Sequence, residues 1–305
     1  MYKNIIPKLV SIDTNLKKIR GLHICQNFDF FDQTVEKNRF HYKVVLKNDI
    51  IIPKDYEFRN EHFIKKGEYW YYEKKIFSIN LKFEYDVSKK IFYFNRAYSF
   101  FPFQVGGICP VGVNISAMIS LDMFLAGFFY GRGMALKVNN KTLCFCAPGF
   151  NGKTFFLNYC LTNGAKYIAE DILVIDFVKN IVYPTCPFLK FNFWQRRKIK
   201  DTLKKVIKKE IIIKDPLPID KLFLFQNSLS FNYQSKNKDF FKFSLFSSLS
   251  FFNNLFTSSY IYEENLGEFV LEQAINLKRI NIKCIYLCCK NFNINSILKK
   301  LWIAK

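Results

Sequence analysis

Eight consecutive residues near the middle of the chain have the types and spacing of a phosphate-binding loop. With alanine in place of the usual first glycine, they read Ala147-Pro148-Gly149-Phe150-Asn151-Gly152-Lys153-Thr154. In such a loop, backbone N–H groups and the positive N-terminus of the following helix bind phosphate oxygens. Lys153 would reach the β- and γ-phosphates, and the Thr154 hydroxyl would be a ligand of Mg²⁺. An ordinary glycine-containing turn before a helix is the alternative.

Two adjacent acidic residues, Glu170 and Asp171, interrupt an apolar run that is typical of a buried strand. Burying carboxylates in such a strand is costly unless a metal ion or hydrogen bonds compensate. We therefore expect Asp171 to hold Mg²⁺, directly or through water. Glu170 would accept a proton from an attacking hydroxyl group. Exposure of both residues at the end of a strand is the alternative interpretation.

Charge on a transferred phosphoryl group also needs cationic stabilisation. Arg132, Arg196 and Arg197 are the candidates, in a chain that uses lysine far more often than arginine. A guanidinium group matches the geometry of phosphate with two parallel hydrogen bonds, whereas an ammonium group acts as a point charge. Arg196 and Arg197 equally fit the solvated, basic start of a helix.

The segments around the acidic pair and the loop follow the order strand, loop, helix, strand. The apolar run 142–147 predicts a strand, residues 153–164 have helical spacing and stop at Gly164, and 167–177 predicts another strand. This is the setting that a phosphate-binding loop requires.

Upstream of the loop, residues 116–133 have apolar side chains at helical spacing, with Gly131 and Gly133 able to end the helix. A turn is expected at Asn139–Asn140. Because strands and helices alternate from about residue 115 onward, the sequence predicts an α/β fold.

Residues 1–105 instead predict a smaller β-rich region of short strands, because β-branched and aromatic residues gather at 43–53, 68–87 and 90–100. Two domains are therefore expected, the β-rich region 1–105, assigned to acceptor recognition, and a P-loop domain over 106–305. Further expected elements are helices at 201–211, 243–256 and 293–302, and strands at 221–226 and 281–290.

The chain is expected to be cytoplasmic and without a membrane span. The uncharged stretch between Arg96 and Asp122 is long enough to span a bilayer, but prolines and glycines interrupt it. We interpret it as a buried strand and loop followed by a core helix at about 115–130. Residues 1–14 lack the apolar segment of a signal peptide. The nine cysteines include no CxxC pair and fit buried thiols in a reducing compartment.

The composition leaves one other function open. The chain has 305 residues and a formal net charge of +21, and half of its residues are hydrophobic, which excludes a disordered tail. Excess lysine with interleaved Phe and Tyr fits the binding of single-stranded nucleic acid. The charges are not gathered in one tract, however, so a general bias toward Lys, Ile, Asn and Phe is the simpler explanation.

Taken together, the loop, the acidic pair and their spacing resemble the nucleotide-binding core of the HPr kinase/phosphorylase family. That family shares its P-loop fold with ATP-dependent phosphoenolpyruvate carboxykinase. The corresponding residues are Ala147 to Thr154, then Asn163-Gly164-Ala165, then Glu170-Asp171, and Asp171 follows Lys153 by 18 residues, as the family's spacing requires. The resemblance implies a mixed sheet and a kinase-like domain over 106–305.

The resemblance also implies an activity. This is transfer of a phosphoryl group, dependent on ATP or another nucleoside triphosphate and on Mg²⁺, to a serine-like hydroxyl of a protein, peptide or small molecule. Arg132 stands where many members have histidine, Ala147 replaces glycine, and the first acid is glutamate rather than aspartate. These departures keep a second hypothesis open, a nucleotide-binding regulator without transfer activity. Whether the chain forms a homo-oligomer is left open.

Overall fold

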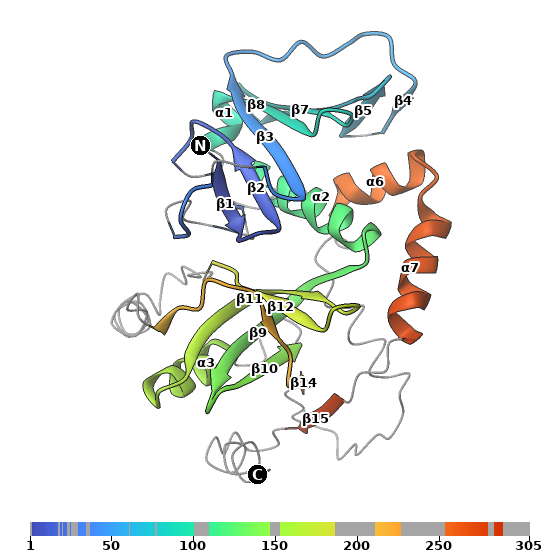
Figure 1. The fold of residues 1–305 in the computed structure, drawn as a ribbon. Helices are drawn as coiled ribbons and strands as arrows, with labels where there is room; N and C mark the ends of the chain where they lie inside the picture. Colours follow the sequence, from blue (N-terminus) through green and yellow to red (C-terminus); the bar gives the residue numbers. More distant parts are fainter. Residues whose placement is uncertain are drawn as a thin grey trace. The chain divides into compact units, whose positions relative to one another are not determined.

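Strands dominate the computed structural model, which is a mixed α/β structure with two mixed sheets and few described helices (Figure 1). The α/β expectation is confirmed at this level. The described residues are 2–17, 19, 21–22, 25, 30–34, 37–60, 62–76, 78–100, 110–146, 153–186, 211–226, 254–279 and 284–288.

Contacts divide the chain into two units. Unit 1 comprises Met1–Ala126 and Ser250–Glu272, and unit 2 comprises Gly127–Leu249 and Gln273–Lys305. Each unit therefore contains segments that are distant in the sequence. The expected domain boundary between residues 105 and 106 is not tested by this division and stays a prediction.

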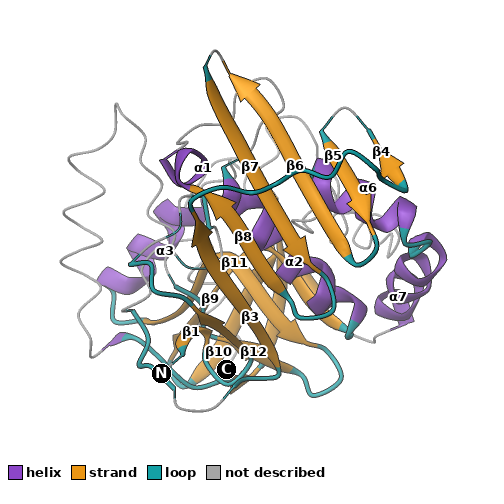
Figure 2. Cartoon of the chain, turned by 90° about the horizontal axis from the view of Figure 1, so that it is seen from above, coloured by secondary structure: helices purple, strands orange, loops and turns teal. Residues whose placement is uncertain are grey.

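Unit 1 contains an eight-stranded sheet in the order β1-β2-β3-β8-β7-β6-β5-β4. The β2–β3 and β3–β8 pairs are parallel and the others antiparallel, and Figure 2 shows β3, β8, β7 and β6 side by side. The β-rich character expected for residues 1–105 is thus confirmed. The strands are β1 (Lys3–Ile6), β2 (Val10–Asp13), β3 (Phe40–Lys47), β4 (Phe58–Arg59), β5 (Phe63–Lys66), β6 (Tyr69–Ile76), β7 (Ile79–Asp86) and β8 (Ile91–Asn95).

Helix α6 (Leu255–Glu263) contributes an aromatic side chain to the core of unit 1. The ring of Phe256 lies 5.1 Å from that of Phe63, 5.4 Å from that of Phe83 and 5.9 Å from that of Trp70, between centroids. All four residues are buried. Aromatic burial and edge-to-face packing therefore hold a late segment of the chain on the N-terminal sheet.

Buried hydrogen bonds hold α6 to α2 (Val111–Leu125) as well. The Asn254 side chain accepts from the backbone N–H of Thr257, which caps α6, and its amide donates to Asn114 Oδ1 at 3.0 Å. Asn114 in turn donates to the Tyr98 hydroxyl, in the short helix α1 (Arg96–Phe100). Because buried amides are costly when unsatisfied, this chain of bonds fixes how these helices pack.

Unit 2 contains a seven-stranded sheet in the order β13-β12-β11-β9-β10-β14-β15. Strand β9 is antiparallel to both β10 and β11, whereas β10–β14 and β14–β15 are parallel. The expected strands at 142–147, 167–177 and 221–226 are confirmed. The strands are β9 (Phe128–Val138), β10 (Lys141–Cys146), β11 (Lys166–Asp176), β12 (Ile181–Tyr183), β13 (Leu217–Pro218), β14 (Lys221–Gln226) and β15 (Cys284–Cys288).

The helix expected at 153–164 is present as α3 (Lys153–Thr162), and Figure 1 shows it beside the sheet of unit 2. Gly164, at φ +87°, follows its end, in a conformation that glycine adopts without strain. Phe156 on α3 is fully buried, and its ring lies 5.3 Å from that of Phe145 on β10. The helix is thereby packed against the strand that precedes the loop.

The prediction of one helix over 116–133 was wrong at its C-terminal end. Helix α2 stops at Leu125, Gly127 has φ +86°, and β9 begins at Phe128. Phe128–Tyr130 are buried on both faces of the sheet, so their apolar run carries no alternation that separates strand from helix. The turn expected at Asn139–Asn140 is confirmed, with positive φ at both residues.

Other expectations fall partly or wholly outside the described residues. The strand expected at 281–290 is confirmed as β15, but the helices at 201–211 and 293–302 lie outside, as does most of 243–256. Helix α7 (Gly267–Arg279) was not expected. Within the described ranges, every helix is too short or too polar to cross a bilayer. Five cysteines are buried and in no disulfide: Cys25, Cys144, Cys146, Cys160 and Cys186.

Fully buried tyrosines should make the protein unfold at alkaline pH. Burial raises the pKa of Tyr42 and Tyr85 in unit 1, and of Tyr130 and Tyr167 in unit 2, well above the usual value. In the unfolded chain these phenols ionise at about pH 10. The contribution of these tyrosines to the free energy of unfolding should therefore be constant at neutral pH and fall as the pH rises past about 10.

Near-ultraviolet absorbance of tyrosinate, recorded together with circular dichroism, checks this. We expect one group of tyrosines to ionise at ordinary pH and a second group to ionise only as the fold is lost. Ionisation of all tyrosines in one step, with the circular dichroism unchanged, would contradict it.

Candidate functional site

Strand register brings the end of β10 level with the acidic pair of β11. Cys146, the last residue of β10, is paired with Gly133 of β9, and Gly133 is paired on its other side with Asp171. Neighbouring strands lie about 4.8 Å apart, so the backbones of Cys146 and Asp171 are separated by about 10 Å. The loop-like sequence follows Cys146 directly in the chain.

Gly133 is required by space at the centre of this arrangement. A Cβ added there would lie 2.6 Å from the carbonyl oxygen of Phe145 and 2.8 Å from Leu173 Cβ. Contacts this short force the neighbours to move, and one of them is backbone. Glycine at this position therefore permits β9 to pack tightly between β10 and β11.

Asp171 has an unusual backbone for a strand residue. Its φ is +63°, in the left-handed region, which costs a non-glycine residue roughly 1–2 kcal/mol. Regular alternation would put Asp171 on the face of Gly133 and Leu173, opposite Arg132, which is paired with Ile172. The left-handed conformation breaks that alternation, and the carboxylate contacts the guanidinium group of Arg132.

The ion pair between Arg132 and Asp171 joins β9 to β11. Arg132 Nη1 donates to Asp171 Oδ2. The Asp171 side chain is 7% exposed and that of Arg132 is 28% exposed. A nearly buried carboxylate thus has a cationic partner that reaches it from the more open side, which offsets much of the cost of its burial.

Tyr130 lies close to this pair and extends the polar cluster. Its hydroxyl is buried and has no hydrogen-bond partner among the described residues. Burial raises the pKa of Tyr130, the charge of Arg132 lowers it, and the charge of Asp171 raises it. The hydroxyl therefore stays protonated at neutral pH beside both charges.

Glu170 is buried as well, with 2% of its surface exposed. It is paired with Met134, two residues from Arg132 along β9, so the register puts Glu170 and Arg132 on the same face. Its charge adds to the rise in the pKa of Tyr167, which burial dominates. The interpretation that the acidic pair is exposed at a strand end is therefore wrong for both residues.

The remaining expected site residues fall outside what the structure describes. Helix α3 begins at Lys153, but the side chains of Lys153 and Thr154 are not described. The same holds for Arg196 and Arg197, and for the loop residues Ala147, Pro148, Gly149, Phe150, Asn151 and Gly152. Of the candidates, Arg132, Glu170 and Asp171 are thus brought together on neighbouring strands.

The donor chemistry of Asp171 fits Mg²⁺, which favours carboxylate oxygens and commonly takes only one or two of them from the protein. The carboxylate already holds a cationic group, the guanidinium of Arg132. Within the described ranges, no three His, Cys, Asp or Glu side chains form a metal-binding cluster. Asp171 is therefore a single carboxylate of the kind that Mg²⁺ takes, and it is paired with Arg132.

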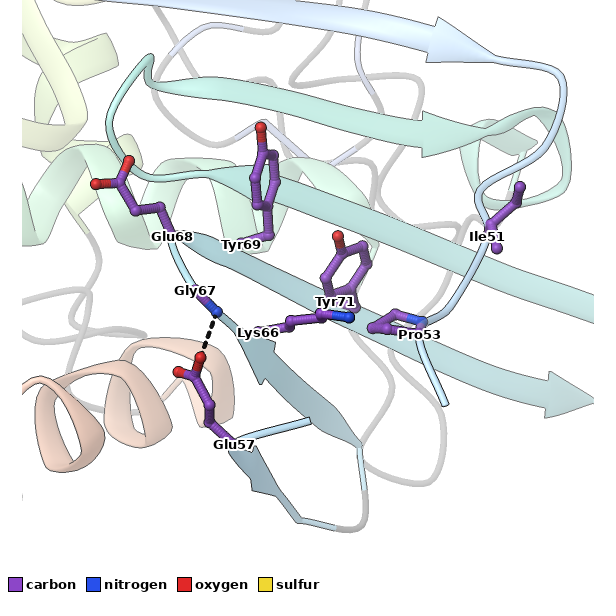
Figure 3. Close-up of a pocket in the computed structure, with 8 residues that line it drawn as sticks. All are labelled: Ile51, Pro53, Glu57, Lys66, Gly67, Glu68, Tyr69 and Tyr71. Atoms are coloured by element: carbon purple, nitrogen blue, oxygen red, sulfur yellow. Dashed lines mark hydrogen bonds between the residues drawn. The ribbon is translucent and has the colours of Figure 1, made fainter. Parts of the chain in front are cut away.

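A separate cleft in unit 1 bears on the nucleic-acid hypothesis. Figure 3 shows the rings of Tyr69 and Tyr71 projecting from the same side of β6, with 6.3 Å between their centroids. Two carboxylates line the same cleft, and that of Glu57 accepts from the backbone N–H of Gly67. The lining residues are Ile51, Pro53, Glu57, Lys66, Gly67, Glu68, Tyr69 and Tyr71. Carboxylates beside the rings oppose phosphate, so the cleft does not favour nucleic-acid binding.

Comparison with known proteins gives no family. No protein-family model matches the chain, and no curated protein matches it in sequence. The likeness to the HPr kinase/phosphorylase family therefore rests on the sequence motifs alone.

Replacing Gly133 with alanine should damage unit 2 measurably. The added methyl group has no space between β10 and β11, so Gly133→Ala should lower the free energy of unfolding by about 1–3 kcal/mol. Gly267→Ala is the matched control, because a Cβ there meets no atom within 4 Å. Denaturant titration measures both variants. Equal stability of the two would contradict the close packing at Gly133.

Proposed function

We propose that the chain binds a nucleoside triphosphate with Mg²⁺ and transfers its terminal phosphoryl group to a hydroxyl acceptor, in the manner of HPr kinase. The supporting observation is the register of Cys146, Gly133 and Asp171 in adjacent strands. It sets a buried carboxylate at the level where the phosphate-binding sequence begins. Helix α3 starts at Lys153, the seventh of the eight residues of that sequence, as phosphate binding at a helix N-terminus requires.

Each residue of the proposed site has one role. Backbone N–H groups of residues 147–152 and the N-terminus of α3 bind the phosphates, and Lys153 neutralises their terminal charge. Thr154 and Asp171 hold the metal ion. When bound, Mg²⁺ neutralises charge on the phosphoryl group during transfer.

Glu170 is the proposed base that accepts the proton of the acceptor hydroxyl. Its burial favours this role, because a base held away from bulk water meets the acceptor hydroxyl without competition from solvent. Its position one residue from Asp171 brings the base and the metal ligand to the same strand.

A second function, a nucleotide-binding regulator without transfer, is favoured by one observation. Arg132 holds the carboxylate that the metal would need. If that contact persists with nucleotide bound, Asp171 cannot position the metal for transfer, and the site binds without turnover. The two functions share the same binding residues and differ only in whether the bound nucleotide gives up its phosphoryl group.

Nucleotide binding should depend on Lys153. ATP with Mg²⁺, at roughly a hundred times its dissociation constant, should stabilise the wild-type protein by about 2.7 kcal/mol. Lys153→Ala should abolish that stabilisation, whereas Lys141→Ala, an exposed lysine at the start of β10, should keep it. Thermal unfolding with and without nucleotide measures both. Normal stabilisation of Lys153→Ala would contradict the proposed phosphate site.

The base is tested by a different variant. Glu170→Gln should bind nucleotide as the wild type does but lose transfer to any accepted hydroxyl, by roughly 10²–10⁴-fold. Release of labelled γ-phosphate onto a panel of serine-containing peptides and small alcohols measures this. Wild-type protein that binds nucleotide and transfers to no acceptor would support the regulator instead.

A further inference from the structure

The ion pair of Arg132 and Asp171 has the properties of an exchangeable contact rather than a fixed structural one. Arg132 Nη1 donates to Asp171 Oδ2, but the arginine side chain is four times as exposed as the aspartate, 28% against 7%. The guanidinium group is therefore the more accessible member of the pair.

The backbone conformation of Asp171 also indicates an exchangeable contact. Its left-handed φ of +63° turns the carboxylate toward Arg132, against the regular alternation of β11. Strained backbone of this kind persists only where the surroundings determine it, and such positions cluster at ligand sites and switches. Here the strand pairing on both sides of Asp171, Glu170 with Met134 and Ile172 with Arg132, holds the backbone in this conformation.

The guanidinium group of Arg132 and the carboxylate of Asp171 can each bind another partner of the opposite charge. A guanidinium group binds phosphate oxygens as well as it binds a carboxylate, with the same fork geometry. A carboxylate can likewise bind either a guanidinium group or a divalent cation. One exchange of partners, guanidinium to phosphate and carboxylate to metal, therefore leaves no charge unpaired.

We propose that Arg132 couples anion binding to cation binding at this site. With no phosphate present, the guanidinium neutralises Asp171 and opposes the binding of a free divalent ion. When nucleotide phosphates bind, Arg132 moves to them and Asp171 becomes available to the metal. The site then binds nucleotide and metal as a unit. This inference rests on the proposed function, since it assigns a regulation to that same site.

The proposal predicts effects of opposite sign from one substitution. Arg132→Met removes the competitor of the metal and the partner of the phosphate. It should bind free Mn²⁺, used as a probe for Mg²⁺, about tenfold more tightly than the wild type. It should bind ATP in the presence of EDTA about tenfold more weakly. A merely structural arginine would lower both affinities together, because its loss would leave a damaged site.

Electron paramagnetic resonance of Mn²⁺ and fluorescence of a labelled ATP measure the two affinities separately. Arg132→Lys keeps the charge but loses the fork, so it should fall between the wild type and Arg132→Met in both. Arg59→Met, an exposed arginine of β4 in unit 1, is the matched control and should change neither. Two affinities that fall together, or that both stay at wild-type values, would overturn the proposal.

Failure of this inference is distinguishable from failure of the proposed function. If Lys153→Ala binds ATP normally, the phosphate site itself is wrong. If Lys153→Ala loses ATP while Arg132→Met matches the wild type in both assays, the phosphate site stands and the exchange is overturned. Circular dichroism and the unfolding midpoint of each variant establish that it is folded before the affinities are compared.

Discussion

The close approach at Gly133 is the constraint on which the proposed site depends. Strand β9 is hydrogen-bonded on both sides, and at Gly133 there is no space for even a methyl group between the Phe145 carbonyl and Leu173. The two ladders of β9 hold the end of β10 and the acidic pair of β11 at one level, and glycine at position 133 lets them close without a clash. Because a phosphate site and a carboxylate must act on the same ligand, a fixed separation is what the chemistry needs.

In the proposed site, the ion pair between Arg132 and Asp171 determines whether the carboxylate is available to a metal ion. Asp171 is nearly buried and takes a left-handed backbone that turns it toward Arg132. A buried carboxylate needs a cationic partner, but Arg132 and a metal ion are competing partners. Under the proposed function, the partner that Asp171 holds when nucleotide is bound separates a phosphotransferase from a binding regulator. The nearby Tyr130 hydroxyl, protonated at neutral pH, adds no charge to that competition.

Local pattern in the sequence was enough to predict α3, β10, β11 and the turn at Asn139–Asn140, because each has its own periodicity or turn residues. It also predicted the burial cost at Glu170 and Asp171. It did not predict the end of α2, since Phe128–Tyr130 are buried on both faces and show no alternation. Gly133 was interpreted as a helix stop, and only the register of three strands gives it its role. The contact of Phe256 with Trp70 and Phe83 joins segments far apart in the chain, which no local pattern contains.

The central claim is that the loop after β10 and Asp171 serve one ligand. It is tested most directly by the affinity for ATP of the wild type and of Asp171→Asn, each measured with Mg²⁺ and with EDTA. Asparagine tolerates the left-handed backbone, so this variant removes the charge without adding strain. We predict that Mg²⁺ strengthens ATP binding in the wild type, that this gain is lost in Asp171→Asn, and that binding in EDTA persists. An equal gain from Mg²⁺ in both proteins would contradict the claim.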